Sequence, residues 1–399
     1  MANQKFTIPS EFQDELRYTE LSDIRSDKEI LAELARHHPV TSEKNIWAYW
    51  HAGINGIPDW CKRNIANWAR IHDKSWSIHV LDTVPGSPNN ALKFIPADLL
   101  PETFVKGTMD GDYVGPHSAD FLRGALLYLH GGCFIDVGCL LFRSFDDICW
   151  NELADPQSPY QISTPWMYGT LMANHFVAAR RGDEFIRRWH QLFLHLWKGR
   201  TNYEGLALNP LLAFGLELDF AESAERGFKW EFGADPVLVF GYITQVLAWA
   251  RLCMLEDSGD GFSSADYAVN NVLWFDSLVE NWAAEPVVGF KGQDLFDALA
   301  TRLDTDPESE EYKLAYKVVW RLLTRSSMQK ITHGKNITKD PALGVLWDLE
   351  ENRNKDCEPG TFGELLRYGS THFVQTRKGV AQIKVQKPAK TQKKGLLEP

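Results

Sequence analysis

The chain has 399 residues, of which 44% are hydrophobic and 24% are charged. This length fits one large α/β domain with insertions, or two domains, and the composition excludes a disordered chain. The net charge of -11 argues against a protein that coats nucleic acid. The charge is uneven, because seven basic residues and one acidic residue lie between Arg377 and Glu398. We therefore expect a basic, flexible tail at residues 376–399.

The sequence carries no recognisable targeting or membrane-spanning segment. The first residues lack an apolar stretch, and no run approaches the ~18 apolar residues of a spanning helix. The six cysteines show neither Cys-x-x-Cys nor Cys/His zinc spacing, which is typical of free thiols in a reducing compartment. We expect a cytoplasmic protein with no bound metal, no membrane partner and no DNA partner.

The first third of the chain predicts a βαβ unit. Residues 1–44 are polar, with one helical stretch, and form a leader that packs on the body. Aromatic and β-branched residues predict strands at 45–50 and 76–82, and apolar residues near a 3.6-residue period predict a helix at 59–72. Such a unit implies a parallel sheet covered by helices.

A second helix and strand follow without a break. The sequence predicts a helix at 118–132, capped by Ser118 and ended by the Gly-Gly pair at 131–132. The next apolar run, 133–142, predicts a central strand that Asp136 interrupts. A carboxylate within a buried strand has to be paired, hydrogen-bonded or bound to a ligand. Asp136 is therefore either a satisfied structural residue or part of a functional site.

The remaining sequence indicates a mostly helical carboxyl-terminal portion. An amphipathic helix is predicted at 183–198, and residues 230–350 alternate helical patterns with acidic loops. The predicted fold class is thus α/β, a mixed sheet flanked by helices, followed by helical additions.

One constellation of residues resembles a known family. The pattern A-D-x-x-R-x-x-x-L-Y-x-x-G-G-x-x-x-D at residues 119–136 resembles the sugar-binding region of GT-A glycosyltransferases. The capsular-polysaccharide and DXD-sugar-binding families look most similar. The resemblance implies a GT-A-like (Rossmann-like) catalytic domain at residues 45–375. It also implies that Asp120 and Arg123 hold a sugar or phosphate, and that Trp47 and Trp50 belong to the nucleotide-binding start.

The chain departs from that family at the second carboxylate of its D-x-D motif. In the family, two carboxylates at i and i+2 hold a divalent cation on the diphosphate. Here the triplet is Asp136-Val137-Gly138. The pair Asp146-Asp147 could supply the missing charge, although it follows ten residues later.

The departure and the expected location suit a second resemblance, to the fungal arginine-containing cyclodipeptide synthases. This resemblance implies a tRNA-dependent enzyme without a cofactor. It would join arginine from arginyl-tRNA to a residue from a second aminoacyl-tRNA and release an arginine-containing diketopiperazine. Carboxylates bind a guanidinium in bidentate fashion, so an acidic pocket of Asp120, Asp136, Asp146 and Asp147 would hold the arginine.

The sequence therefore favours the synthase. The alternatives are a cytosolic GT-A glycosyltransferase with a degenerate D-x-D motif, using a nucleotide sugar with Mn²⁺ or Mg²⁺, and a non-catalytic binding module. His175 and Glu204 are alternative general bases, although a buried histidine is more often structural. The candidate catalytic residues are Asp120, Asp136, His175 and Glu204. The candidate substrate-binding residues are Arg123, Asp146, Asp147, Trp47, Trp50 and Tyr203.

Overall fold

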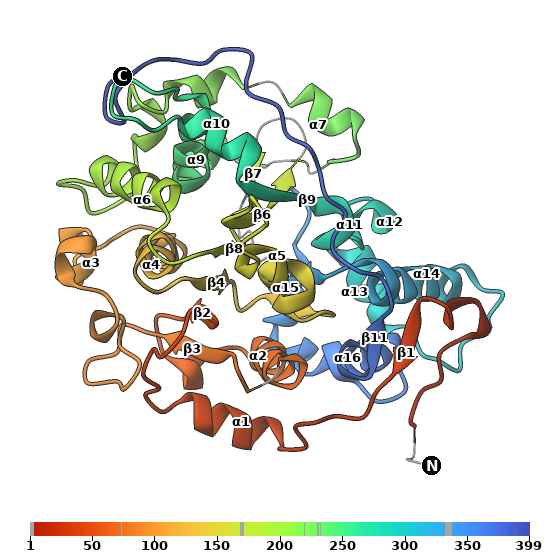
Figure 1. Cartoon of the computed structure of the whole chain (residues 1–399). Coiled ribbons are helices and arrows are strands. Elements are labelled where there is room, and N and C mark those ends of the chain that lie inside the picture. The colour runs from red at the N-terminus through yellow and green to blue at the C-terminus, as the bar shows by residue number, and fades with distance from the viewer. Residues whose placement is uncertain are drawn as a thin grey trace.

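The computed structural model of the protein describes residues 4–72, 74–167, 171–218, 220–229, 231, 233–331 and 337–399. A seven-stranded sheet in this part of the chain lies at the centre of the molecule (Figure 1). Its order is β3-β2-β4-β8-β6-β7, and β9 pairs with β6. The strands are β2 (Asn45–Tyr49), β3 (Ser77–Leu81), β4 (Gly132–Ile135), β6 (Ile162–Met167), β7 (Leu171–Met172), β8 (Phe176–Ala179) and β9 (Val272–Asp276).

The sheet is mixed. The β3-β2-β4 part is parallel, the pairs β4-β8, β8-β6 and β6-β7 are antiparallel, and β9 runs parallel to β6. The predicted βαβ unit is confirmed by β2, α2 (Asp59–Ile71) and β3. Because β2 and β3 are parallel, their carboxyl ends meet at one edge of the sheet, which we call the carboxyl edge.

Helices cover both faces of the sheet, and β2 shows how the sequence divides between them. Trp47 faces one hydrophobic core, and its neighbours Ile46 and Ala48 face the other, as the two-residue period of a strand requires. The first core includes α4 (Val114–His130), α6 (Glu184–Leu196), α9 (Thr244–Met254) and α10 (Ser264–Asn270). The second includes α1 (Asp27–Leu34), α2, α13 (Gly292–Ala300), α14 (Glu310–Arg325) and α16 (Phe362–His372).

Short helices connect these elements. They are α3 (Glu102–Val105), α5 (Asn151–Ala154), α7 (Ala221–Glu225), α8 (Pro236–Tyr242), α11 (Ser277–Glu280), α12 (Glu285–Val288) and α15 (Leu343–Trp347). Most of the helices follow β8, so the carboxyl-terminal portion is mostly helical (Figure 1). The predicted fold class is confirmed. No single helix among the described residues is long and apolar enough to cross a membrane, although α8 and α9, bent by 81°, pass such a test as a pair.

Helix α4 begins at Val114, four residues before the predicted start. Its N-cap residue is Tyr113, which makes no capping bond through its side chain. Ser118 lies buried within the helix, so the prediction that it caps the helix was wrong. The extra turn contains Pro116, which the first turn of a helix tolerates because that turn has no partner for its N–H groups. The helix ends at His130, and the φ of 69° at the following Gly131 agrees with the predicted glycine stop.

The run 133–142 forms two strands instead of one. β4 ends at Ile135, and a turn follows in which the amide of Cys139 donates to the carbonyl of Asp136 (3.0 Å). The chain then continues as β5 (Cys139–Leu141), which pairs antiparallel with β10 (Met328–Lys330) outside the main sheet. The predicted single strand was wrong, because a buried apolar run does not reveal a change of sheet. Asp136 therefore lies in a turn at the carboxyl edge.

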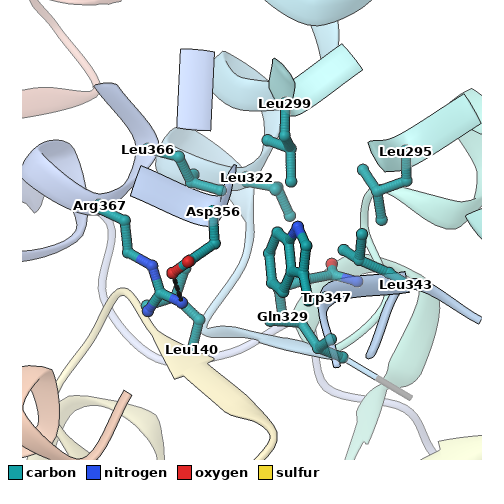
Figure 2. A pocket seen from close by; sticks show the side chains of 11 residues that line it. Leu140, Leu295, Leu299, Leu322, Gln329, Leu343, Trp347, Asp356, Leu366 and Arg367 are labelled. Carbon is teal, nitrogen blue, oxygen red and sulfur yellow. Dashed lines mark ion pairs between the residues drawn. The ribbon is translucent and has the colours of Figure 1, made fainter. Parts of the chain in front are cut away.

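The carboxyl-terminal helices pack around a small cavity of about 10 Å³. Figure 2 shows the Trp347 ring among leucine side chains, with the Asp356–Arg367 ion pair (2.7 Å) beside them. A cavity of ~10–15 Å³ holds one water at most. This cavity is a gap in the packing and is too small for a substrate.

The two ends of the chain are joined to the body. β1 (Leu16–Tyr18) pairs with β11 (Phe373–Gln375), and residues 376–399 then run across the molecule toward α10 (Figure 1). The amides of Ile383 and Gln392 donate to carbonyls of β9 and α9, at 2.9 and 2.8 Å. Arg377 makes two bonds, of 2.7 and 2.8 Å, to the fully buried carboxylate of Glu280. The segment predicted to be a tail thus carries contacts along its length.

Removal of this ion pair should destabilise the fold. We expect Arg377→Met to lower the free energy of unfolding by about 2–3 kcal/mol, because it leaves a buried carboxylate without its cation. The loss stays moderate because Glu280 keeps donors from Ser327 and Ala381. Urea unfolding measures it, with the exposed Lys378→Met as control. Equal stability of the two variants would contradict a structural role for the pair.

Candidate functional site

The carboxyl edge of the sheet gathers several of the predicted site residues. Asp136 follows β4, and His175 precedes β8, which runs antiparallel to β4. The end of one strand and the start of the other therefore meet, and the amide of Asp136 donates to the carbonyl of His175 (2.9 Å). Asp120 and Arg123 reach the same place from one face of α4, because residues three apart are neighbours on a helix.

Arg123 lies at the centre of this group. Its side chain is 2% exposed and stacks on Phe134, 4.6 Å from the ring centroid. Nη1 donates to the carboxylate of Asp120 and to the side-chain oxygen of Gln245, and Nη2 donates to Asp136 at 3.2 Å. A buried guanidinium needs such acceptors and counter-charges. Arg123 therefore ties α4 to the turn after β4.

Two amides complete the network around Asp120. Asn174 donates to the Asp120 carboxylate (3.1 Å) and to the side-chain oxygen of Gln245 (3.0 Å). The Gln245 amide in turn donates to the backbone carbonyl of Asp120. Because the members are almost fully hydrogen-bonded, the carboxylate has one fixed orientation.

A lysine from the carboxyl-terminal portion joins the group. Nζ of Lys330 lies 2.7 Å from Oδ2 of Asp136, and the two side chains are 14% and 29% exposed. Burial alone would raise the pKa of Asp136, but Lys330 and Arg123 hold it below its usual value. Burial would lower the pKa of Lys330, but Asp136 raises it. Both groups are therefore charged at neutral pH. We call Asp120, Arg123, Asp136 and Lys330 the charged cluster.

His175 lies beside the cluster as a neutral group. The side chain is 4% exposed, and burial together with Lys330 lowers its pKa to about 3. Nε2 lies 3.0 Å from the side-chain amide of Asn281, which is fully buried. His175 thus bridges the main sheet and the carboxyl-terminal portion.

A group of aromatic side chains lies near Oδ2 of Asp120, the carboxylate oxygen that Arg123 does not contact. Tyr203 packs against Tyr113 and His117, with ring centroids 5.5 and 5.3 Å away, and Tyr242 lies 5.8 Å from His117. Nδ1 of the buried His117 lies 3.7 Å from Oδ2 of Asp120. Neither ring nitrogen of His117 has a hydrogen-bond partner within the described ranges.

A cleft of about 580 Å³ opens at the carboxyl edge. It is bounded by the ends of β2 and β3, by residues 103–112 and by the first turns of α4. Tyr49, Thr83 and Ser118 are among the residues that line it. Ser118, which lines the cleft, therefore lies two residues before Asp120 on the same helix. Ligand pockets commonly span ~300–1,000 Å³, so the cleft fits a ligand of moderate size.

The other predicted site residues lie elsewhere. Asp146 pairs with Lys44 (2.9 Å) and accepts from the indole of Trp76. These partners precede β2 and β3, so Asp146 lies at the edge of the sheet opposite the carboxyl edge. Asp147 is exposed there and bonds Ser144. The four carboxylates of the expected acidic pocket thus do not form one group.

Trp47, Trp50 and Glu204 lie outside the charged cluster. Trp47 is fully buried, donates to the carbonyl of Gly131 and stacks on His79. Trp50 follows β2 and donates to the carbonyl of Gly56. Glu204 is exposed in the loop after α6. The catalytic and binding roles assigned to the site residues remain predictions.

Lys330, Gln245 and His117 were not among the predicted site residues. Lys330 and Gln245 lie far along the chain from Asp120, in segments with no local motif. His117 precedes Asp120 by one helical turn, and that spacing was the one available signal. Regarding metals, no three His, Cys, Asp or Glu side chains gather as a ligand set in the described part of the chain.

Comparisons with known proteins identify relatives of the whole chain. Residues 5–205 match the family of capsular polysaccharide synthesis proteins. The chain is 52% identical to the probable glycosyltransferase FCK3 of Fusarium pseudograminearum, over 98% of this chain and 99% of the relative. It is 39% identical to the O-glycosyltransferase braB of Annulohypoxylon truncatum, over 96% and 92%. It is 37% identical to the O-glycosyltransferase PaGT of Phomopsis amygdali, over 92% and 91%.

These relatives correct the favoured hypothesis. They carry glycosyltransferase names and align along almost the whole chain, so the assignment to the arginine-containing cyclodipeptide synthases was wrong. The expected partners, arginyl-tRNA and a second aminoacyl-tRNA, were therefore wrong as well, and so was an arginine-binding role for the acidic residues. The broken D-x-D motif that suggested the synthase therefore needs another explanation.

The buried, neutral His175 should make stability depend on pH. Its pKa of about 3 in the folded protein lies below the unfolded value of ~6.5. The unfolded state therefore binds more protons below pH 6.5, and stability falls as the pH falls toward 3. We expect His175→Gln to reduce this slope by about 1.4 kcal/mol per pH unit. Urea unfolding at pH 5 and 6 measures it, with the exposed His195→Gln as control. An unchanged slope would show that His175 is charged in the folded state.

Proposed function

Because the chain belongs to the family of capsular polysaccharide synthesis proteins and is related along almost its whole length to these fungal glycosyltransferases, we propose that it transfers a sugar. The donor is a nucleoside-diphosphate sugar, and the acceptor is a hydroxyl group. The observation that carries the proposal is the cleft at the carboxyl edge, whose lining includes the first turns of α4, the helix that also carries Asp120 and Arg123. A donor of this kind has two parts, a nucleotide and a sugar diphosphate, and the site offers a place for each.

The nucleotide would occupy the cleft. Ligands of α/β sheets bind beyond the carboxyl ends of the parallel strands, which is where Tyr49 and Thr83 line the cleft. The first turn of α4 also lines it, and no side chain caps that helix. The helix dipole favours a negatively charged group at this end. The diphosphate would therefore extend from the start of α4 toward the charged cluster.

The sugar would bind next to Asp120. One oxygen of its carboxylate is held by Arg123 and Asn174, and the other lies near His117. A carboxylate fixed in this way can accept hydrogen bonds from sugar hydroxyls, and the unpaired nitrogens of His117 can bond a further hydroxyl. Binding energy of this kind orients the reacting carbon for transfer.

The reaction breaks the bond between the anomeric carbon and the diphosphate, and forms a bond from that carbon to the acceptor oxygen. The electron pair stays with the departing diphosphate, and the proton of the acceptor hydroxyl passes to the solvent. Cations near the leaving group stabilise the growing negative charge. The O-glycosyltransferase names of two relatives support an oxygen acceptor.

The role of Asp120 can be tested by substitution. We expect Asp120→Asn to lower kcat/KM for sugar transfer by about 100-fold or more, because the amide accepts fewer and weaker hydrogen bonds from the sugar. The assay supplies uridine- and guanosine-diphosphate sugars with phenolic and alcohol acceptors, and detects products by mass. Asp147→Asn, at the opposite edge of the sheet, is the matched control. Turnover in Asp120→Asn equal to that in the control would remove Asp120 from the site.

The position of the nucleotide can be tested by filling the cleft. Gly115 lines it, and a Cβ at this position would meet no atom closer than 3.7 Å. We expect Gly115→Leu to weaken binding of the matching nucleoside diphosphate by about 10-fold or more, the scale of a steric cost of ~1–3 kcal/mol. Calorimetric titration measures the affinity. The control is Leu92→Ala, which only enlarges the cleft. The exposed Gly107→Ala is unsuitable as a control, because a side chain at its φ of 65° is strained.

A further inference from the structure

We propose that this glycosyl transfer needs no divalent metal ion. The ammonium group of Lys330 stands beside Asp136 and serves the diphosphate leaving group in place of that ion. The inference rests on the proposed function. The D-x-D family uses the cation to neutralise that group. The residues at this site of the chain do not fit such a cation.

The position of the second carboxylate has no room for a side chain. A Cβ atom at residue 138 would lie 2.7 Å from the carbonyl oxygen of Ile331 and 3.6 Å from Nζ of Lys330. The Ile331 backbone cannot easily move, because its amide donates to the carbonyl of Gly138 (2.8 Å) and β10 is paired with β5. The glycine is thus required by the close approach of β10, the strand that carries Lys330.

The first carboxylate is already committed to cations. Oδ2 of Asp136 bonds Lys330 at 2.7 Å, and Oδ1 bonds Arg123 at 3.2 Å. A divalent ion at Asp136 would have to displace these groups or lie next to two positive charges. Hard cations also need several oxygen ligands, and Asp136 has no second carboxylate beside it in the pair of strands. The donor set does not fit Mn²⁺ or Mg²⁺.

Lys330 is held in place by its neighbours. It pairs with Cys139 in the β10–β5 register, and its amide donates to the carbonyl of Asn281 (2.8 Å). The preceding side chain, Gln329, points the other way and bonds the buried carboxylate of Glu285 at 2.9 and 3.1 Å. Because successive side chains of a strand point to opposite faces, Gln329 holds β10 on one side and Lys330 directs its ammonium group to the site on the other.

The ammonium can perform the electrostatic part of the reaction. An ammonium carries three N–H donors, and among the described residues Asp136 takes one, so two can reach the diphosphate. As the bond to the anomeric carbon breaks, the electron pair moves to the diphosphate oxygen, and these donors stabilise its added charge. No proton has to leave Lys330. Asp136 keeps the lysine oriented and charged.

The first experiment measures the metal requirement of the wild-type protein. Protein freed of metals with EDTA is assayed for sugar transfer in EDTA and in Mn²⁺ or Mg²⁺. We expect rates that agree within about two-fold. A loss of more than 10-fold in EDTA that Mn²⁺ restores overturns the inference and leaves the proposed function intact. Absence of turnover with every nucleotide sugar, with or without metal, overturns the proposed function and this inference with it.

The second experiment assigns the role to Lys330. We expect Lys330→Met to lower kcat/KM by about 100-fold, and Lys330→Arg to retain about a tenth of the wild-type value, because it keeps the charge. Lys339→Met, an exposed residue paired with Glu231, is the control. Titration with UDP and GDP in EDTA adds a binding readout, in which Lys330→Met weakens the wild-type affinity by about 10-fold. A fully active Lys330→Met variant overturns the inference, and the EDTA measurement decides independently if this variant does not fold.

Discussion

The site depends on one carboxylate shared by two cations. Asp136 binds Arg123 from α4 and Lys330 from β10, so three separate parts of the chain meet at a single turn. Each charge is costly to bury alone, and each is stabilised by the opposite charge of its neighbour. The network cannot lose one member without leaving another uncompensated. This constraint explains why the cluster also recruits the amides of Asn174 and Gln245.

The same constraint links the helical carboxyl-terminal portion to function. The β10 strand belongs to that portion, yet it completes the site of the main sheet. Its pairing with β5 follows directly from the turn at Asp136, and Gln329, next to Lys330 in β10, donates to the buried carboxyl group of Glu285. An otherwise structural carboxyl group therefore helps to set the position of Lys330. The helical portion thus contributes one of the four members of the charged cluster.

Periodicity and the motif predicted the sheet, α2, α4 and the meeting of Asp120, Arg123 and Asp136, because those features are local or joined by one helix and one strand. Lys330 lies 194 residues from Asp136, and no local pattern carries that information. The sequence also showed the loss of the second carboxylate but not its cause. Gly138 suggested a site that binds a different substrate, whereas the structure relates it to the close approach of β10.

The pairing of β1 with β11 has a consequence for biosynthesis. A ribosome makes the chain from its amino terminus, so β1 has no partner strand until residues 373–375 have been translated. Lys330 and Arg377 also emerge late. Contacts between residues so distant in sequence form slowly, and domains fold as their segments emerge. The nascent chain therefore exposes β1 without its partner strand until residue 375 has emerged, and Asp136 has only Arg123 as its cation until Lys330 has emerged.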